Sequence, residues 1–130
     1  MKLFILIGFM ILIVLAFVVG TFVGQNFEGF TKLKEIKNDA QAYYFLKSNN
    51  IQLWGIESCS WCEKQRDEFG TWFSLMLEHD IYVNCQENQS IMEECIAYDS
   101  GTPFWVKDNE VIHSGYIPVD QVKKVLGEKI

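Results

Sequence analysis

The sequence predicts an α/β domain whose elements follow the order β-α-β, then a helix, then β-β-α. Three features predict this order. Short apolar runs of strand length begin at Ile51, Ile81, Phe104 and Val111. Apolar residues at helical spacing separate the first two runs, and a Cys-x-x-Cys motif stands where that helix would begin. One transmembrane helix and a linking helix are expected to precede the domain.

The chain divides into three predicted parts. Residues 3–23 carry no formal charge, and this length spans a bilayer, whereas the apolar region of a secretory signal has roughly 7–15 residues. No cleavage site of the A-x-A type is evident, so we expect an uncleaved transmembrane signal anchor over 1–24. A helix with an apolar stripe links the anchor to the domain over 25–50, and the globular domain covers 51–130.

The charge balance excludes one class of partner. Of the 11 basic residues only Lys2 precedes residue 25, which leaves 10 basic against 17 acidic residues in the remainder. A surface this acidic repels phosphate backbones, so nucleic acid is not expected as a partner. The four cysteines suit an oxidising compartment, and we therefore expect the domain on the extracytoplasmic side of the membrane.

The motif Cys59-Ser60-Trp61-Cys62 predicts thiol–disulfide chemistry. Cys59 is expected at a helix N-terminus, where unpaired N–H groups and the helix dipole favour a thiolate over a thiol. Cys62 comes one turn later on the same side and can attack a mixed disulfide that Cys59 has formed. Cys59 is therefore the predicted nucleophile and Cys62 the resolving residue. The alternatives are a passive structural disulfide and half of a metal site.

The helices are expected over three ranges that follow from apolar spacing and capping residues. The first covers 63–79, directly after the motif. The second begins at Ser90 as N-cap, with Glu93 in the capping-box position, and extends through residue 98. The third covers 119–126 and ends at Gly127. Residues 108–110 form the predicted turn between the last two strands.

The pair Thr102-Pro103 precedes the third strand, and with it the element order becomes the minimal layout of a thioredoxin-like fold. In that fold this loop lies beside the cysteines, so we expect a cis bond here, although only about 5–6% of X–Pro bonds are cis. Proline has no N–H, which leaves a neighbouring backbone edge free to pair with an extended substrate. Thr102, Pro103 and an exposed Trp61 are the predicted substrate contacts. The alternative is an ordinary turn proline.

The stretch from Cys59 to Gly70, Cys-Ser-Trp-Cys-Glu-Lys-Gln-Arg-Asp-Glu-Phe-Gly, resembles the active-site helix of thioredoxin-like domains associated with vitamin K epoxide reductase homologues. Gly101-Thr-Pro-Phe-Trp105 is similar to that family's proline loop, and the likeness covers about residues 51–126. In this chain Ser-Trp replaces the usual Pro-His between the cysteines. The resemblance implies protein thiol and disulfide substrates and, as a partner, a membrane oxidase of the vitamin K epoxide reductase type on a separate chain.

The family often carries a second cysteine pair, and Cys85 and Cys95 fall at the matching places. We expect a structural disulfide between them, which closes a loop of about ten residues and stabilises the fold by ~2–3 kcal/mol. An electron relay to Cys59 and Cys62 is the alternative. A four-cysteine zinc site is disfavoured because the spacing lacks the second tight pair of a zinc ribbon, so no metal or cofactor is expected.

Glu57 precedes the motif by two residues and is a candidate proton acceptor for Cys62, the alternative being a solvated carboxylate. His79 and His113 have no ligand-like neighbours in the sequence and are expected on the surface. The aromatic residues assigned to core packing are Trp54, Phe69, Trp72 and Phe73.

These features together predict a membrane-anchored thiol–disulfide oxidoreductase that exchanges disulfides with exported proteins and is recharged by a membrane oxidase. Two alternatives remain open. The first is a thiol reductant fed by a membrane electron carrier, which would use the same residues in the reverse direction. The second is a redox-inert binding or assembly module with the same fold.

Overall fold

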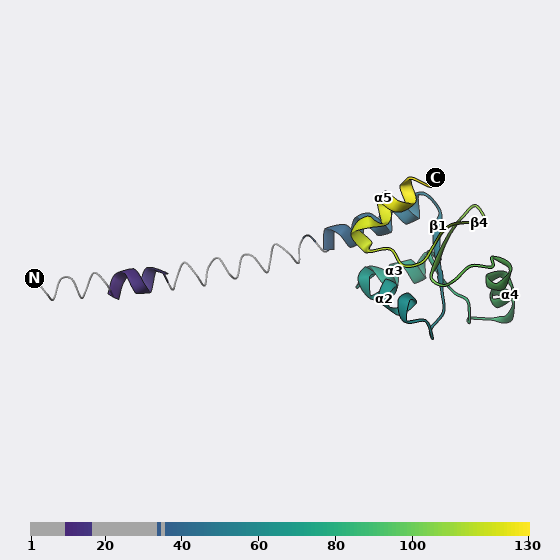
Figure 1. Ribbon diagram of the computed structural model, residues 1–130, viewed down its shortest axis with the longest axis horizontal. Helices are drawn as coiled ribbons and strands as arrows, with labels where there is room; N and C mark the ends of the chain where they lie inside the picture. The colour runs from purple at the N-terminus through teal and green to yellow at the C-terminus, as the bar shows by residue number, and fades with distance from the viewer. Residues whose placement is uncertain (1–9, 17–33, 35) are drawn as a thin grey trace, which may run out of the picture. The chain divides into compact units, whose positions relative to one another are not determined.

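A computed structural model describes residues 10–16, 34 and 36–130, and the chain divides into two units, Met1–Ile36 and Lys37–Ile130 (Figure 1). In the first unit a helix covers 10–16. The rest of the predicted signal anchor over 1–24, and residues 25–33 and 35 of the linking helix predicted over 25–50, lie outside the described residues. Within the described part of the chain, no helix combines the length and the apolar character needed to cross a membrane.

The second unit is built on a four-stranded sheet with the order β2-β1-β3-β4. β1 (Ile51–Gly55) pairs in parallel with β2 (Tyr82–Asn84) and antiparallel with β3 (Phe104–Lys107). β4 (Glu110–Ser114) pairs antiparallel with β3. The turn between them is Asp108–Asn109, one residue shorter than the predicted 108–110, because Glu110 already pairs with Lys107. The mixed α/β order predicted from the sequence is confirmed, and the arrangement is compatible with a thioredoxin-like fold.

The helices of this unit cover the sheet. A helix over 36–48 leads into β1, and two helices connect the parallel strands β1 and β2, as a parallel pair requires. The remaining elements are α2 (Ser60–Phe69), α3 (Trp72–Glu78), α4 (Gln89–Ala97), the 3₁₀ turn η1 (Val119–Gln121) and α5 (Val122–Gly127).

One long helix over 63–79 was predicted, and this prediction is wrong. The chain breaks at Gly70, which has a φ of +50°, in the left-handed region that glycine adopts without steric cost. Gly70 N–H donates to Asp67 O and closes α2 at its C-terminal end. The apolar spacing continues through the break, which is why periodicity alone joined the two helices.

The predicted start of α4 also needs correction. Its N-cap is Asn88, whose side-chain oxygen accepts a hydrogen bond from Ile91 N–H at 3.0 Å. Ser90, the predicted cap, lies inside the helix. Asparagine and serine are both strong N-cap residues, so the sequence offered two starts two residues apart.

Two apolar clusters lie on opposite faces of the sheet. Leu53 and Trp105 belong to the larger cluster, which the helix over 36–48, α2, α3 and α5 cover. Trp54 and Phe104 belong to the smaller one, against which α4 packs. Successive residues in a strand point to opposite faces, which explains the division. The core assignments are confirmed: Trp54 and Phe69 are buried, and Trp72 and Phe73 are partly buried against the core.

Candidate active site

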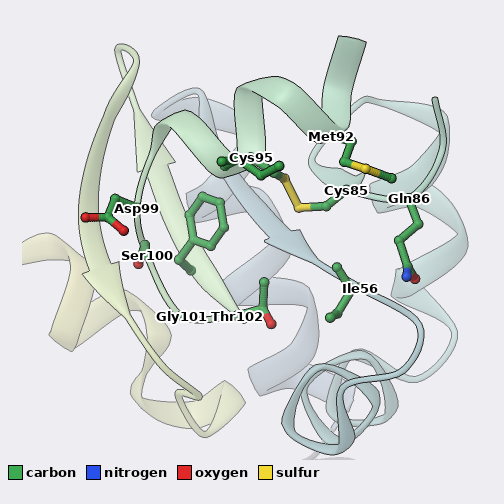
Figure 2. A pocket seen from close by; sticks show the side chains of 11 residues that line it. Ile56, Cys85, Gln86, Met92, Cys95, Asp99, Ser100, Gly101 and Thr102 are labelled. Carbon is green, nitrogen blue, oxygen red and sulfur yellow. A yellow bond between two sulfur atoms is a disulfide. The ribbon is translucent and has the colours of Figure 1, made fainter. Parts of the chain in front are cut away.

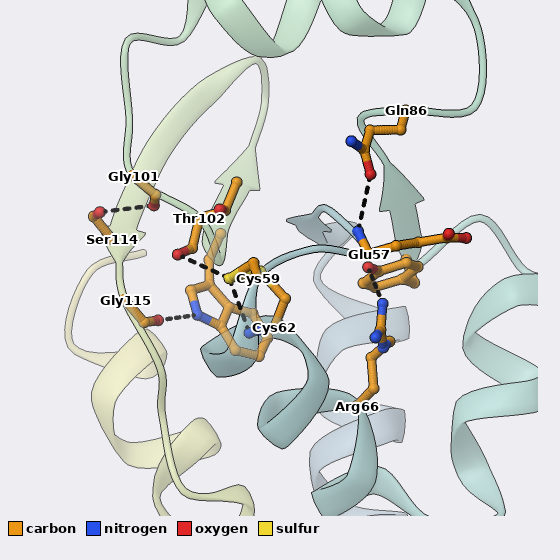
Figure 3. Close-up of a disulfide and its surroundings, with 11 residues drawn as sticks. Glu57, Cys59, Cys62, Arg66, Gln86, Gly101, Thr102, Ser114 and Gly115 are labelled. Atoms are coloured by element: carbon orange, nitrogen blue, oxygen red, sulfur yellow. Dashed lines mark hydrogen bonds between the residues drawn. A yellow bond between two sulfur atoms is a disulfide. The ribbon is translucent and has the colours of Figure 1, made fainter.

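Cys59 and Cys62 form a disulfide at the start of α2 (Figure 3). Cys59 is the N-cap residue, in an extended conformation, and its Sγ accepts a hydrogen bond from Cys62 N–H at 3.1 Å. The two sulfurs differ in access, because Cys59 is half-buried whereas Cys62 is 1% exposed. An approaching thiolate therefore reaches Cys59 Sγ. Cys62 is placed to be the leaving group when the Cys59–Cys62 bond breaks, and to attack Cys59 Sγ in a mixed disulfide when the bond forms again.

The loop before β3 lies against Cys59. The Thr102–Pro103 peptide bond is cis, as expected, and Thr102 O lies 3.5 Å from Cys59 Sγ (Figure 3). The Pro103 side chain is buried, and its carbonyl accepts a hydrogen bond from Gly115 N–H at 2.7 Å. Thr102 O is thus one atom of this loop that faces Cys59 Sγ. That both residues contact substrate stays a prediction.

Trp61 points outward between the two cysteines and is 56% exposed. Its ring centroid lies 5.6 Å from that of Tyr116. Lys64 Nζ lies 5.2 Å from the Trp61 centroid and 4.5 Å from the Tyr116 centroid, which places a cation over both ring faces. An apolar surface with one positive charge thus borders the disulfide, and its contact with substrate stays a prediction.

The carboxylate of Glu57 has other partners than Cys62. Glu57 is exposed, and its Oε1 accepts a hydrogen bond from Asn84 Nδ2 at 3.4 Å. Its backbone N–H donates to Gln86 Oε1 at 3.1 Å (Figure 3). Among the described residues no hydrogen bond joins Glu57 to either cysteine of the motif. Its role as proton acceptor stays a prediction.

Tyr82 is a neighbour of Cys62 that the sequence did not reveal. A Cβ on Gly55 would lie 2.9 Å from Tyr82 Oη and 3.3 Å from Cys62 Sγ, so both atoms border the space that this glycine leaves empty. Arg66 Nη1 donates to Tyr82 Oη at 3.3 Å. A phenol that faces a cation therefore lies near the buried sulfur. Only the register of β1 with β2, which pairs Leu53 with Tyr82, brings it there.

Gln65 holds α2 in place and was also missed. Its side chain is 0% exposed. Its Nε2 donates to Ile117 O at 2.8 Å, and its Oε1 accepts from Ile117 N–H at 2.8 Å. Glu68 adds hydrogen bonds from the Tyr116 hydroxyl and from Val119 N–H. The signal in the sequence is a glutamine within an apolar pattern, three residues after Cys62.

The second pair, Cys85 and Cys95, forms a disulfide that joins the end of β2 to α4. Cys85 is 4% exposed, and Cys95 is half-buried. All four cysteines of the chain are thus paired. This is the pairing that the family resemblance implied.

The two histidines differ in environment. His79 is exposed, as predicted. His113 lies on β4 opposite Trp105, where it is partly exposed. Burial lowers the pKa of His113 below its ordinary value, and the positive charge of Lys129 adds to the effect.

Comparison of the chain with protein-family models found no match, and comparison with curated proteins found none either. The case for the site therefore rests on its geometry. A reachable sulfur at a helix N-terminus, a buried partner sulfur and a carbonyl before a cis proline together form a centre suited to disulfide exchange.

Proposed function

We propose that this protein is a membrane-anchored, thioredoxin-like thiol–disulfide oxidoreductase that acts on exported proteins. One observation carries the proposal: the half-buried Cys59 sulfur lies at the N-cap of α2, faces Thr102 O at 3.5 Å, and is bonded to a buried Cys62. The Cys85–Cys95 disulfide likewise joins a buried and a half-buried sulfur, but neither of its cysteines caps a helix, whereas Cys59 combines the N-cap position with the contact to Thr102 O.

The exchange proceeds in two displacements. A substrate thiolate attacks Cys59 Sγ, the Cys59–Cys62 bond breaks, and its electron pair goes to Cys62, which takes up a proton. A second substrate thiolate then attacks the substrate sulfur of the mixed disulfide. It forms the substrate disulfide and releases Cys59 as a thiolate. The substrate loses two electrons and two protons, and the cysteine pair gains both electrons.

The proposal includes a membrane partner. The charge-free stretch over 3–23, of which 10–16 is helical and wholly apolar, supports a signal anchor. The two disulfides support an extracytoplasmic domain. A membrane oxidase of the vitamin K epoxide reductase type would accept the two electrons from reduced Cys59 and Cys62. The cysteines themselves carry the chemistry, and no cofactor is proposed.

The second candidate is a thiol reductant that receives electrons from a membrane carrier. The same two cysteines serve either direction, so the reduction potential of the pair decides between them. A potential of about −120 mV supports an oxidant, and one of about −270 mV supports a reductant. Equilibration of the full chain with glutathione buffers, followed by thiol alkylation and mass spectrometry, measures it.

Trapping tests the exchange itself. In Cys62→Ala the Cys59 thiolate can still attack a substrate disulfide, but the thiol that resolves the mixed disulfide in that direction is missing, so substrates should stay bound to Cys59 and appear as adducts on non-reducing gels. Cys59→Ala is the matched control and should trap none. If neither variant accumulates adducts, and the wild-type chain neither oxidises dithiothreitol nor reduces insulin, the protein is a redox-inert module and the proposal fails.

A further inference from the structure

The structure contains a groove of about 580 Å³, which Figure 2 shows from close by. It lies between α4, the residues that follow β1 and β2, and the loop that leads to Pro103. Its volume falls within the roughly 300–1,000 Å³ typical of ligand pockets. The lining residues that matter below are Ile56, Met92, Cys95, Ile96, Asp99 and Thr102.

The walls of the groove are largely apolar. Met92 and Ile96 project from α4 and are 38% and 70% exposed. Ile56 and Phe104 also line the groove, as do both cysteines of the Cys85–Cys95 disulfide. Figure 2 shows this disulfide beside Met92 and across from Ile56. Large apolar side chains beside a hollow indicate a surface that binds another apolar group.

The groove is continuous with the exchange centre through Thr102. Thr102 lines the groove, and its carbonyl oxygen lies 3.5 Å from Cys59 Sγ. A polypeptide whose cysteine is bonded to Cys59 therefore has its neighbouring residues at the mouth of the groove. This proximity makes a segment of the substrate itself the occupant.

The charges near the groove indicate which kind of substrate segment it binds. From Asp67 to Val106 the chain contains no lysine or arginine. Asp99 lines the groove and is exposed. A carboxylate at the edge of an apolar hollow, with no lysine or arginine in the segment that forms most of its lining, attracts a basic residue that stands next to an apolar one.

We propose that this groove binds a substrate segment in which a large apolar side chain adjoins a lysine or arginine, a few residues from the reacting cysteine. The apolar side chain occupies the space between Met92, Ile96 and Ile56, and the cation lies near Asp99. The inference rests on the proposed exchange function and names its substrate class.

Three dithiol peptides that differ at two positions test the inference. The two variable positions lie beside one cysteine. They are leucine and lysine in the first peptide, leucine and glutamate in the second, and serine and lysine in the third. The oxidised full chain should oxidise the leucine–lysine peptide with a kcat/KM on the order of tenfold above either of the others. Added salt should reduce the advantage over the glutamate peptide, because the attraction is screened.

Two variants with matched controls locate the effect. Ile96→Ser removes an exposed apolar wall and should abolish the preference for leucine, whereas Leu77→Ser, also exposed but on α3, should not. Asp99→Asn should abolish the preference for lysine. Asp80→Asn is its control, because Asp80 and Asp99 both have positive φ, which asparagine tolerates.

The outcomes separate the two proposals. Equal rates for the three peptides, or equal effects of each variant and its control, would overturn the inference while oxidation of dithiothreitol continues unchanged. Loss of all oxidation, including that of dithiothreitol by the wild-type chain, would overturn the proposed function instead. If sedimentation shows a dimer that Ile96→Ser dissociates, a second copy occupies the groove and the inference also fails.

Discussion

Replacement of Gln65 by leucine tests how α2 is held in the domain. The glutamine amide makes two hydrogen bonds of 2.8 Å with the backbone of Ile117, and its side chain is 0% exposed. Leucine has a similar volume but leaves the N–H and C=O of Ile117 unpaired. Each unpaired buried group costs ~1–3 kcal/mol, so we expect the free energy of unfolding to fall by about 2–6 kcal/mol.

Equilibrium urea unfolding of the oxidised full chain, followed by tryptophan fluorescence, measures this loss. Gln121→Leu is the control, because Gln121 is exposed on η1, and we expect a change within about 0.5 kcal/mol. A loss below about 1 kcal/mol for Gln65→Leu would show that the Ile117 backbone groups find other partners, and the reasoning would be refuted.

Gln65→Glu provides a second variant in case leucine prevents folding. A protonated carboxyl can repeat both hydrogen bonds, whereas the ionised form turns a negative oxygen toward Ile117 O. Burial should hold the pKa of this carboxyl above its unfolded value of about 4.3. The two hydrogen bonds of the protonated carboxyl therefore stabilise the variant fully below about pH 4.3. This contribution to the free energy of unfolding is lost as the pH rises through the higher pKa of the folded state.

Two further predictions concern residues of the sheet, Gly55 on β1 and His113 on β4. Gly55→Ala places a Cβ 2.9 Å from Tyr82 Oη and 3.3 Å from Cys62 Sγ, and this overpacking should lower the free energy of unfolding by ~1–3 kcal/mol. Gly127→Ala is the control, because its Cβ meets only a 3.9 Å contact and should cause no such loss. Urea unfolding compares the two variants. Because the pKa of His113 is lowered in the folded state, the unfolded chain binds more protons at this residue. The free energy of unfolding should therefore fall as the pH drops below about 6.5, and His113→Gln should remove the contribution of this residue to that pH dependence. Thermal unfolding of both chains between pH 5 and 8 measures the difference.

Local signals predicted most of the scaffold. Apolar runs located the strands, and the position of Thr102-Pro103 before β3 located the cis bond. The motif was correctly placed at a helix start because Cys59 follows a strand and precedes a helical pattern. These features depend on residues that are near one another in the sequence.

The sequence failed where a feature depends on conformation or on distant pairing. The break at Gly70 depends on one backbone angle, which apolar spacing does not record. The bonds between Gln65 and Ile117 join residues 52 positions apart. Tyr82 reaches Cys62 only through the β1–β2 register and the missing side chain of Gly55. Such contacts belong to tertiary structure and have no local pattern.

The most direct test of the central claim compares the reactivity of the two sulfurs in the motif. The full chain is reduced, exposed briefly to limiting iodoacetamide, and mapped by tryptic mass spectrometry. Because Cys59 is half-buried at the N-cap and Cys62 is 1% exposed, Cys59 should be alkylated at least about tenfold faster than Cys62, and faster than free cysteine at the same pH. Equal labelling of the two, or faster labelling of Cys62, would contradict the assignment of Cys59 as the nucleophile.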